Sequence, residues 1–267
     1  MLRRSWIAAT LLSAVLAACS ASAADVKPDV YTFGTLKSVA VETARTQAQE
    51  WLTTSGKSDE ATRKRFDAIW SEAERPLLDK VADTLSLDPT AAKMLKDAGD
   101  LTVSVPKEVP ASLKDTKQSA FYRANLALLF AKSISSRRVY EEALEALKSV
   151  RPEQVIDPSA YYFHKAVAEH ALMKKDEAAQ SIIRLLDDVA DAPDRYKMVA
   201  TLMFFDMQGW RKDEKDLSNI AKLMDNSGRR LDISRAGPKT QEIQKKIVFR
   251  LEEVIKELEN QAKSGGV

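Results

Sequence analysis

The first hundred residues alternate between short polar breaks and runs in which apolar side chains recur every three or four positions. This spacing puts the apolar side chains on one face of a helix, so each run predicts an amphipathic helix. Asp88 is a suitable N-cap with Pro89 directly behind it, and Gly99 ends the same run. The predicted helices cover residues 35–52, 59–74, 76–85 and 88–99.

The segment Leu101–Pro110 (LTVSVPKEVP) has a different pattern. It is rich in β-branched residues and contains two prolines, which disfavour a helix. It lacks the glycine and serine runs of a flexible linker. We therefore predict an ordered, extended connection between two helical halves.

The second half of the chain repeats itself with a period of 35 residues. A period near 34 is typical of a helix–turn–helix unit that buries its apolar face only by stacking on its neighbours. The matching pairs are Ala131 and Ala166, Glu142 and Glu177, Ala143 and Ala178, Leu147 and Ile182, Val150 and Leu185, and Pro158 and Pro193.

The segment Arg138–Val150 (RVYEEALEALKSV) resembles the second helix of a tetratricopeptide repeat, with Ala143 and Leu147 in the conserved small and large positions. The resemblance extends over Gln118–Asn226 and weakens along it, because Lys212 stands where a third unit needs alanine. It implies an all-α fold in which helical hairpins stack as a short TPR-like α-solenoid. The segments RVYEEALEAL and GPKTQEIQKKIV also resemble exported bacterial TPR-like proteins, which implies no activity.

The same resemblance implies a concave groove that binds peptides or partner proteins. In the repeat register the groove residues are Leu128, Phe163, Val167 and His170. Two registers compete in the third unit, and methionine and aromatic side chains suit an adaptable apolar groove. A shift of 35 residues gives Met198, Leu202 and Phe205, whereas a shift of 34 gives Lys197, Thr201 and Phe204.

The C-terminal pattern predicts a turn over Asp232–Gly237 and a helix that begins at Pro238. Its apolar stripe could lie on the last repeat as a cap, or join another chain as a short coiled coil. We favour the cap and a monomer, because the stripe covers only about two heptads. The stripe consists of Ile243, Ile247, Leu251, Val254 and Leu258.

The N-terminus has the pattern of a secretory signal peptide. Arg3 and Arg4 precede an apolar run from Trp6 to Leu16, which is too short to span a bilayer. Two cleavage sites compete. Leu16-Ala17-Ala18-Cys19 resembles a bacterial lipobox, in which Cys19 is lipidated, and we favour it over cleavage after Ala21-Ser22-Ala23. Both imply export to the periplasm or cell envelope, and the first adds a lipid anchor.

Charge and composition exclude several function classes. The chain has 41 Lys and Arg against 39 Asp and Glu; without Arg3 and Arg4 the balance is 39 minus 39, or zero. A neutral body offers no electrostatic surface for nucleic acid or anionic lipid. One Cys and two His exclude a disulfide scaffold and a zinc finger. No nucleophile motif or phosphate loop is present, so we expect no enzyme, no cofactor and no bound metal.

Three further features have competing interpretations. A small-ligand pocket between the two halves could be lined by Trp51, Trp70 and Trp210. A basic cluster near the C-terminus could bind a carboxylate or a lipid headgroup, but we favour pairing with nearby acids or a solvated surface. An acidic run at 187–194 lacks the glycine and closing glutamate of a calcium loop and predicts a solvated turn.

Together these patterns predict an order of segments and a function. The segments are a signal peptide (1–24), an N-terminal helical region (25–99), a connection (100–115), TPR-like repeats (116–230) and a capping helix with its tail (231–267). The predicted function is a non-enzymatic exported scaffold for a protein or peptide partner in the cell envelope. The alternatives are a lipoprotein that assists envelope or outer-membrane assembly, and a small-ligand binder or enzyme.

The two cleavage sites predict different outcomes for one substitution. If Cys19 is lipidated, Cys19→Ala releases the protein from membranes into the soluble envelope fraction. If the chain is cut after Ala23, Cys19→Ala leaves fractionation unchanged. Cell fractionation with intact-mass analysis distinguishes these outcomes, and an unprocessed N-terminus in the wild type would contradict export.

Overall fold

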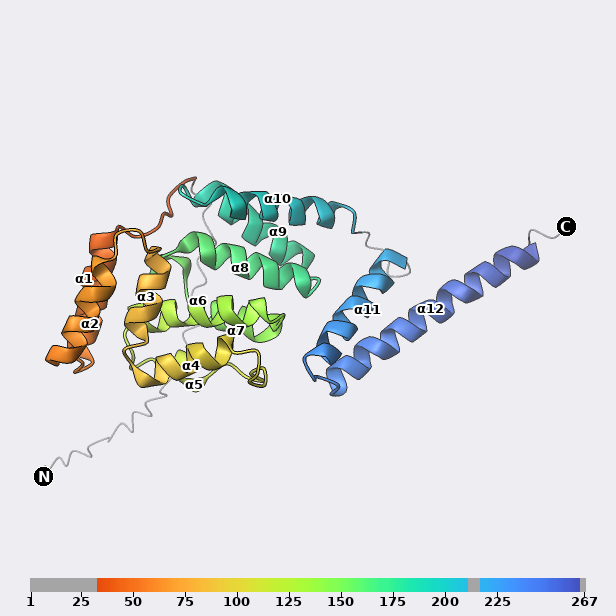
Figure 1. Ribbon diagram of the computed structural model, residues 1–267. Helices are drawn as coiled ribbons and strands as arrows, with labels where there is room; N and C mark the ends of the chain where they lie inside the picture. Colours follow the sequence, from red (N-terminus) through yellow and green to blue (C-terminus); the bar gives the residue numbers. More distant parts are fainter. Residues whose placement is uncertain (1–32, 211–216, 265–267) are drawn as a thin grey trace, which may run out of the picture. The chain divides into compact units, whose positions relative to one another are not determined.

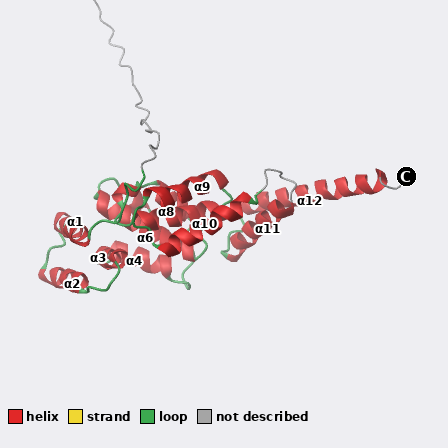
Figure 2. Cartoon of the chain, turned by 90° about the horizontal axis from the view of Figure 1, so that it is seen from above, coloured by secondary structure: helices red, strands yellow, loops and turns green. Residues whose placement is uncertain are grey.

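A computed structural model describes residues 33–210 and 217–264 (Figure 1). Within these residues the regular secondary structure is helical and contains no strand, which confirms the all-α fold class (Figure 2). The helices are α1 (Val41–Thr54), α2 (Glu60–Ser71), α3 (Leu77–Leu85), α4 (Pro89–Gly99), α5 (Ala111–Lys114), α6 (Ala120–Ser136), α7 (Tyr140–Lys148), α8 (Pro158–Ala171), α9 (Lys175–Ile183), α10 (Asp194–Gln208), α11 (Leu217–Asp232) and α12 (Pro238–Ser264).

Two of the N-terminal helices, α2 and α4, begin where an aspartate supplies an N-cap. The carboxylate of Asp88 accepts a hydrogen bond of 3.1 Å from the backbone N–H of Ala91, so α4 begins as predicted. Helices α3 and α4 both pack on α6, which ties this region to the second half of the chain. The segment Leu101–Pro110 forms no helix, as its prolines predict.

The prediction that the first helix begins near Thr35 is wrong. Residues 34–38 form an extended strap, and Leu36 makes an isolated parallel bridge with Val189. The backbone N–H of Gly34 donates to the carbonyl of Asp187 at 2.8 Å. These bonds form because the chain leaves helical geometry after a π-helical turn at Arg184–Asp188, which frees carbonyls for a partner.

Of the acidic run beside this strap, Asp187, Asp191 and Asp194 are exposed as predicted, whereas Asp188 is not. Asp188 is only 1% exposed and pairs with Arg184 one turn earlier, so it does not belong to a solvated turn. Asp191 accepts a hydrogen bond of 2.9 Å from the backbone N–H of Ser38. Asp188 and Asp191 therefore stabilise the structure around the strap.

The central part of the chain consists of two helical hairpins and a fifth helix (Figure 1). Helix α6 packs on α7, and α8 packs on α9. Helix α8 also contacts both helices of the hairpin before it, and α10 contacts both α8 and α9. The same set of neighbours therefore occurs twice.

The two hairpin turns are related by the 35-residue period. Arg138 and Met173 have φ angles of 61° and 59°, a left-handed conformation that is costly for residues other than glycine. The N–H of Val139 donates to the carbonyl of Ile134, and the N–H of Lys174 donates to that of Glu169. Every residue in the second bond lies 35 positions after its counterpart.

Small residues lie fully buried inside the hairpins. The relative exposure of Ala131, Ala143, Ala166 and Ala178 is 0%. At these positions even one added methylene would overlap a neighbouring helix or force the backbone to move. Burial is what the repeat alignment expects of all four.

The C-terminal region is a separate hairpin. Helix α11 ends at Asp232 and α12 begins at Pro238, so the predicted turn is confirmed. Helix α12 packs mainly on α11, whereas the sequence favoured a cap on the last repeat. Lys212, on which the third-unit alignment depends, lies outside the described residues.

The left-handed turn gives a direct test of backbone strain. Met173→Gly should raise the free energy of unfolding by about 0.5 kcal/mol, because relief of about 1–2 kcal/mol of strain exceeds the added entropy of the unfolded chain. Leu172→Gly is the matched control: the φ of Leu172 is −90°, so glycine should lower stability by about 0.5–1 kcal/mol. Denaturant titration measures both, and equal destabilisation by the two would contradict the assignment.

Candidate functional site

Three of the four residues that were predicted to line the groove lie together on α8, and the fourth lies on α6. Phe163, Val167 and His170 are half-buried. Leu128 on α6 is fully buried in the main apolar core, so its side chain is not accessible to a partner. The expectation that Leu128 lines a groove is therefore wrong.

Helix α10 lies against the α8 residues that were assigned to the groove. The Phe163 ring stacks on Tyr196 of α10 with ring centroids 4.2 Å apart. Nε2 of His170 lies 2.9 Å from Oδ2 of Asp206 on α10, and the Trp210 indole N–H donates to the same oxygen at 2.9 Å. Phe163 and His170 thus join α8 to α10.

The outward side of α10 is apolar and uncovered in the described part of the chain. Met198, Leu202 and Phe205 are 65%, 62% and 66% exposed, and they follow one another at helical spacing. This is the set given by the 35-residue shift, whereas the 34-residue set is half-buried. Val199 beside them is also exposed. We call Met198, Val199, Leu202 and Phe205 the α10 outer face.

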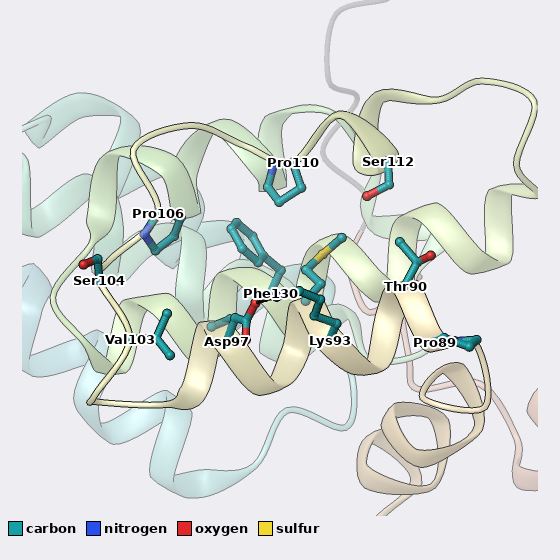
Figure 3. Close-up of a pocket in the computed structure, with 12 residues that line it drawn as sticks. Pro89, Thr90, Lys93, Asp97, Val103, Ser104, Pro106, Pro110, Ser112 and Phe130 are labelled. Carbon is teal, nitrogen blue, oxygen red and sulfur yellow. Dashed lines mark hydrogen bonds and ion pairs between the residues drawn. The ribbon is translucent and has the colours of Figure 1, made fainter.

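A cavity of about 570 Å³ lies between α4, the Leu101–Pro110 segment and α6 (Figure 3). Its lining is mainly apolar, including Met94, Val103 and Phe130, with Pro106 and Pro110 on the wall formed by the connection. Its size lies within the range of small-molecule sites. Sequence analysis missed this cavity, although the proline-broken segment that forms its wall was visible.

The tryptophans do not form the predicted pocket. Trp51 is buried against Tyr122, and the Trp70 indole N–H donates to the Thr84 hydroxyl at 3.0 Å inside the N-terminal helices. Trp210 instead lies beside His170, with ring centroids 5.0 Å apart. None of the three lines the cavity of Figure 3.

Buried ion pairs join the C-terminal hairpin to α7. The Arg229 guanidinium donates to both carboxylate oxygens of Glu141, at 2.8 and 3.1 Å, and Arg230 pairs with the same carboxylate. Arg235 pairs with Glu142 at 2.9 Å and donates to the Pro106 carbonyl at 2.6 Å. We call these five side chains the arginine–glutamate cluster. Pairing with acids, rather than a headgroup site, is therefore the correct interpretation of the basic cluster.

The charges of this cluster act on Glu141. Burial works to raise the pKa of this carboxyl, but the hydrogen bond and charge of Arg229, with the charge of Arg230, outweigh it and lower the pKa to about 2. The carboxylate therefore stays ionised through the ordinary pH range. The cluster serves attachment rather than proton transfer.

The two histidines do not form a metal site. His164 packs edge-on against the stacked rings of Phe163 and Tyr196, and burial together with the charges of Lys132 and Arg195 lowers its pKa to about 4. His170 pairs with Asp206 on another face of α8. Within residues 33–210 and 217–264 there is no group of three His, Cys, Asp or Glu side chains placed to hold a metal ion.

The predicted membrane anchor cannot be located, because Cys19 lies outside the described residues. Among the helices that the structure describes, none is both long enough and apolar enough to cross a bilayer. No protein-family model matches the chain, and comparison with curated proteins and with solved structures gives no match either. The geometry of the chain itself must therefore carry any functional proposal.

The arginine–glutamate cluster predicts a loss of docking when one acid is neutralised. Glu141→Gln should destabilise the attachment of α11–α12 by about 3 kcal/mol, because it leaves buried guanidinium groups without their main counter-charge. Hydrogen exchange in α11 should rise while α6 stays protected. The matched control is Glu145→Gln on the same helix, whose pair with Lys114 is half-exposed and should cost less than about 1 kcal/mol.

The same cluster predicts an acid transition. The pKa of Glu141 is lower in the folded chain than its usual value of 4.5. Its contribution to stability is therefore complete above pH 4.5 and is lost as the pH falls from 4.5 towards 2. Exchange in α11 should increase over that window in the wild type and depend less on pH in Glu141→Gln. The same pH dependence in both proteins would contradict this role.

Proposed function

We propose that the chain is a non-enzymatic interaction scaffold of the bacterial cell envelope, and that its α10 outer face binds an apolar helix of a partner protein. The observation that carries this proposal is the exposure of Met198, Leu202 and Phe205 on one side of α10. Three adjacent large apolar side chains, each more than half exposed, are typical of an interaction site.

The apolar residue pattern of α10 supports the proposal that a partner protein covers this helix. The run Met198–Phe205 (MVATLMFF) contains no charged residue, in a chain of which 30% is charged. A helix that is apolar all round is normally covered on all sides. The inner side of α10 is buried and carries Tyr196, Ala200 and Met207. The outer side therefore gains free energy if another apolar surface covers it.

Two features support a TPR-like arrangement for the hairpins. Each new helix pair repeats the contacts of the one before it, and the left-handed turn recurs after 35 residues at Arg138 and Met173. In stacked repeats the terminal helix usually has a polar outer side that keeps it soluble. Helix α10 is the last helix of this set and lacks such a side, so its exposed face favours a binding role over a capping role.

The chemistry of the partner follows from the surface. An amphipathic helix with apolar residues at positions i, i+3 or i+4, and i+7 would match the spacing of Met198, Leu202 and Phe205. Methionine adapts to partners of differing shape, and phenylalanine adds a large apolar contact area. Export through residues 1–24 and an anchor at Cys19 would place this surface next to envelope proteins, including those under assembly.

The cavity of Figure 3 supports a second candidate function, the binding of an apolar small molecule. Phe130 and Met94 provide an apolar lining, while Lys93 and Asp97 form an ion pair beside them. An apolar fluorescent probe that binds this cavity should lose affinity in Val103→Trp, whose larger side chain takes up part of the space, and not in variants of α10.

The α10 outer face predicts a selective loss of binding. A photo-crosslinking residue at Val199 should capture one envelope protein through a helical segment. Leu202→Lys with Phe205→Lys should then weaken the binding of that segment at least tenfold, because charges replace two apolar side chains that the partner buries. Circular dichroism should stay unchanged, since both side chains are exposed. Calorimetry with the synthetic segment gives the affinity.

A charge-matched control makes this result specific. Leu101→Lys with Leu217→Lys adds the same two charges at side chains that are 81% and 63% exposed elsewhere. It should leave binding unchanged. Equal loss in both variants, or full binding by the α10 variant, would contradict the proposal.

A further inference from the structure

Helix α12 has more apolar surface than its neighbour α11 covers. Ile247 is buried and Ile243 and Val254 are half-buried, and these residues form the stripe that packs on α11. Helix α12 has 27 residues and the described part of α11 has 16, so α12 continues for about 11 residues, or roughly 16 Å, past the first described residue of α11, Leu217 (Figure 1).

A second stripe lies beside the first and is open. Val248, Ile255 and Leu258 are 55%, 55% and 59% exposed, and Leu251 between them is half-buried. Their spacing of three, four and three residues is that of the a and d positions of a coiled coil. Gln244 and Ala262 continue the same positions at the two ends, so the heptad pattern covers almost three heptads.

The charges along α12 select the direction of a partner helix. Lys245, Glu252 and Glu259 occupy the positions that flank the stripe on one side. In a parallel pair these residues would face Ile247, Val254 and Gln261 of the other helix, so no opposite charges would meet. An antiparallel pair instead brings the Lys245 end of each helix against the Glu259 end of the other.

We propose that the protein forms a two-fold symmetric dimer through antiparallel pairing of α12 with α12 of a second copy. Val248 packs against Leu258 of the partner subunit, and Leu251 packs against Ile255 of the partner subunit. Lys245 lies beside Glu259 of the partner subunit at each end. The inner stripe stays on α11, so each copy contributes one hairpin to a four-helix arrangement.

Two observations make a second copy the occupant of choice. The stripe is self-complementary in both apolar spacing and charge, which a two-fold interface requires. The heptad pattern from Gln244 to Ala262 also offers almost three heptads of contact between two copies. One like-charge contact, between Glu252 of each copy, lies near the two-fold axis and weakens the pairing. This inference does not depend on the partner surface proposed for α10.

The first experiment measures mass. The exported protein with Cys19→Ser, in sedimentation equilibrium at tens of micromolar, should show twice the monomer mass that intact-mass analysis gives for it. Ile255→Lys with Leu258→Lys should remove the dimer and retain the helix signal, because both side chains are exposed. Phe249→Lys is the matched control: Phe249 is 54% exposed but off the stripe, so the dimer should persist.

The second experiment tests direction by cysteine cross-linking in the same background. Glu252→Cys should form a disulfide-linked dimer, because residue 252 meets its own copy near the two-fold axis. Lys245→Cys alone should not cross-link, since the two copies of residue 245 lie about 20 Å apart in the antiparallel arrangement. A mixture of Lys245→Cys and Glu259→Cys should cross-link.

The outcomes that would overturn this inference are distinct. A monomer at all concentrations would exclude the second copy as occupant and leave the stripe to another protein. A dimer lost in Phe249→Lys, or in the α10 variant Leu202→Lys, would place the interface elsewhere. Cross-linking by Lys245→Cys alone would establish parallel pairing instead.

Discussion

The close approach of helices at buried alanines is the constraint on which the central part of the chain depends. Ala131 and Ala143 in the first hairpin, and Ala166 and Ala178 in the second, have no exposed surface. A larger side chain at any of them would separate two helices and displace every helix stacked beyond them. Because α10 rests on the second hairpin, the position of its outer face is fixed by these four small residues.

The C-terminal hairpin is attached by a different kind of force. Apolar contacts pack the alanine-rich hairpins together, with hydrogen bonds from the Tyr161 hydroxyl to the Leu147 and Val150 carbonyls, whereas guanidinium and carboxylate groups join α11 to α7. A carboxylate that accepts two hydrogen bonds from Arg229, at 2.8 and 3.1 Å, fixes the orientation of the two groups. Arg235 extends this orientation to the wall of the cavity through the Pro106 carbonyl. Charge therefore sets geometry here, and apolar burial supplies the stability of each hairpin.

The accuracy of the sequence-based predictions varied with the range of the interactions involved. Local signals were reliable: Asp88 caps its helix and Pro238 begins another. The start of the first helix was predicted wrongly because Leu36 and Val39 fit helical spacing. In the structure Leu36 instead pairs with Val189, more than 150 residues later in the sequence. The groove position predicted for Leu128 is wrong because repeat register predicts which side of a helix a residue occupies but not whether another helix covers that side. The uncharged run in α10 is visible in the sequence, but only the packing of α10 on its neighbours shows which side of the helix is exposed.

The strap also constrains the order in which the chain can fold. The bonds between Ser38 and Asp191 join residues 153 positions apart, so the strap cannot dock until the second hairpin has been synthesised. The hairpins themselves need only local contacts and can form as soon as each has emerged from the ribosome. For the export that we propose, such an arrangement is favourable, because a closure over 153 positions waits until Asp191 is available. The strap thus closes only after the residues of both hairpins have been made, and the C-terminal hairpin docks after it.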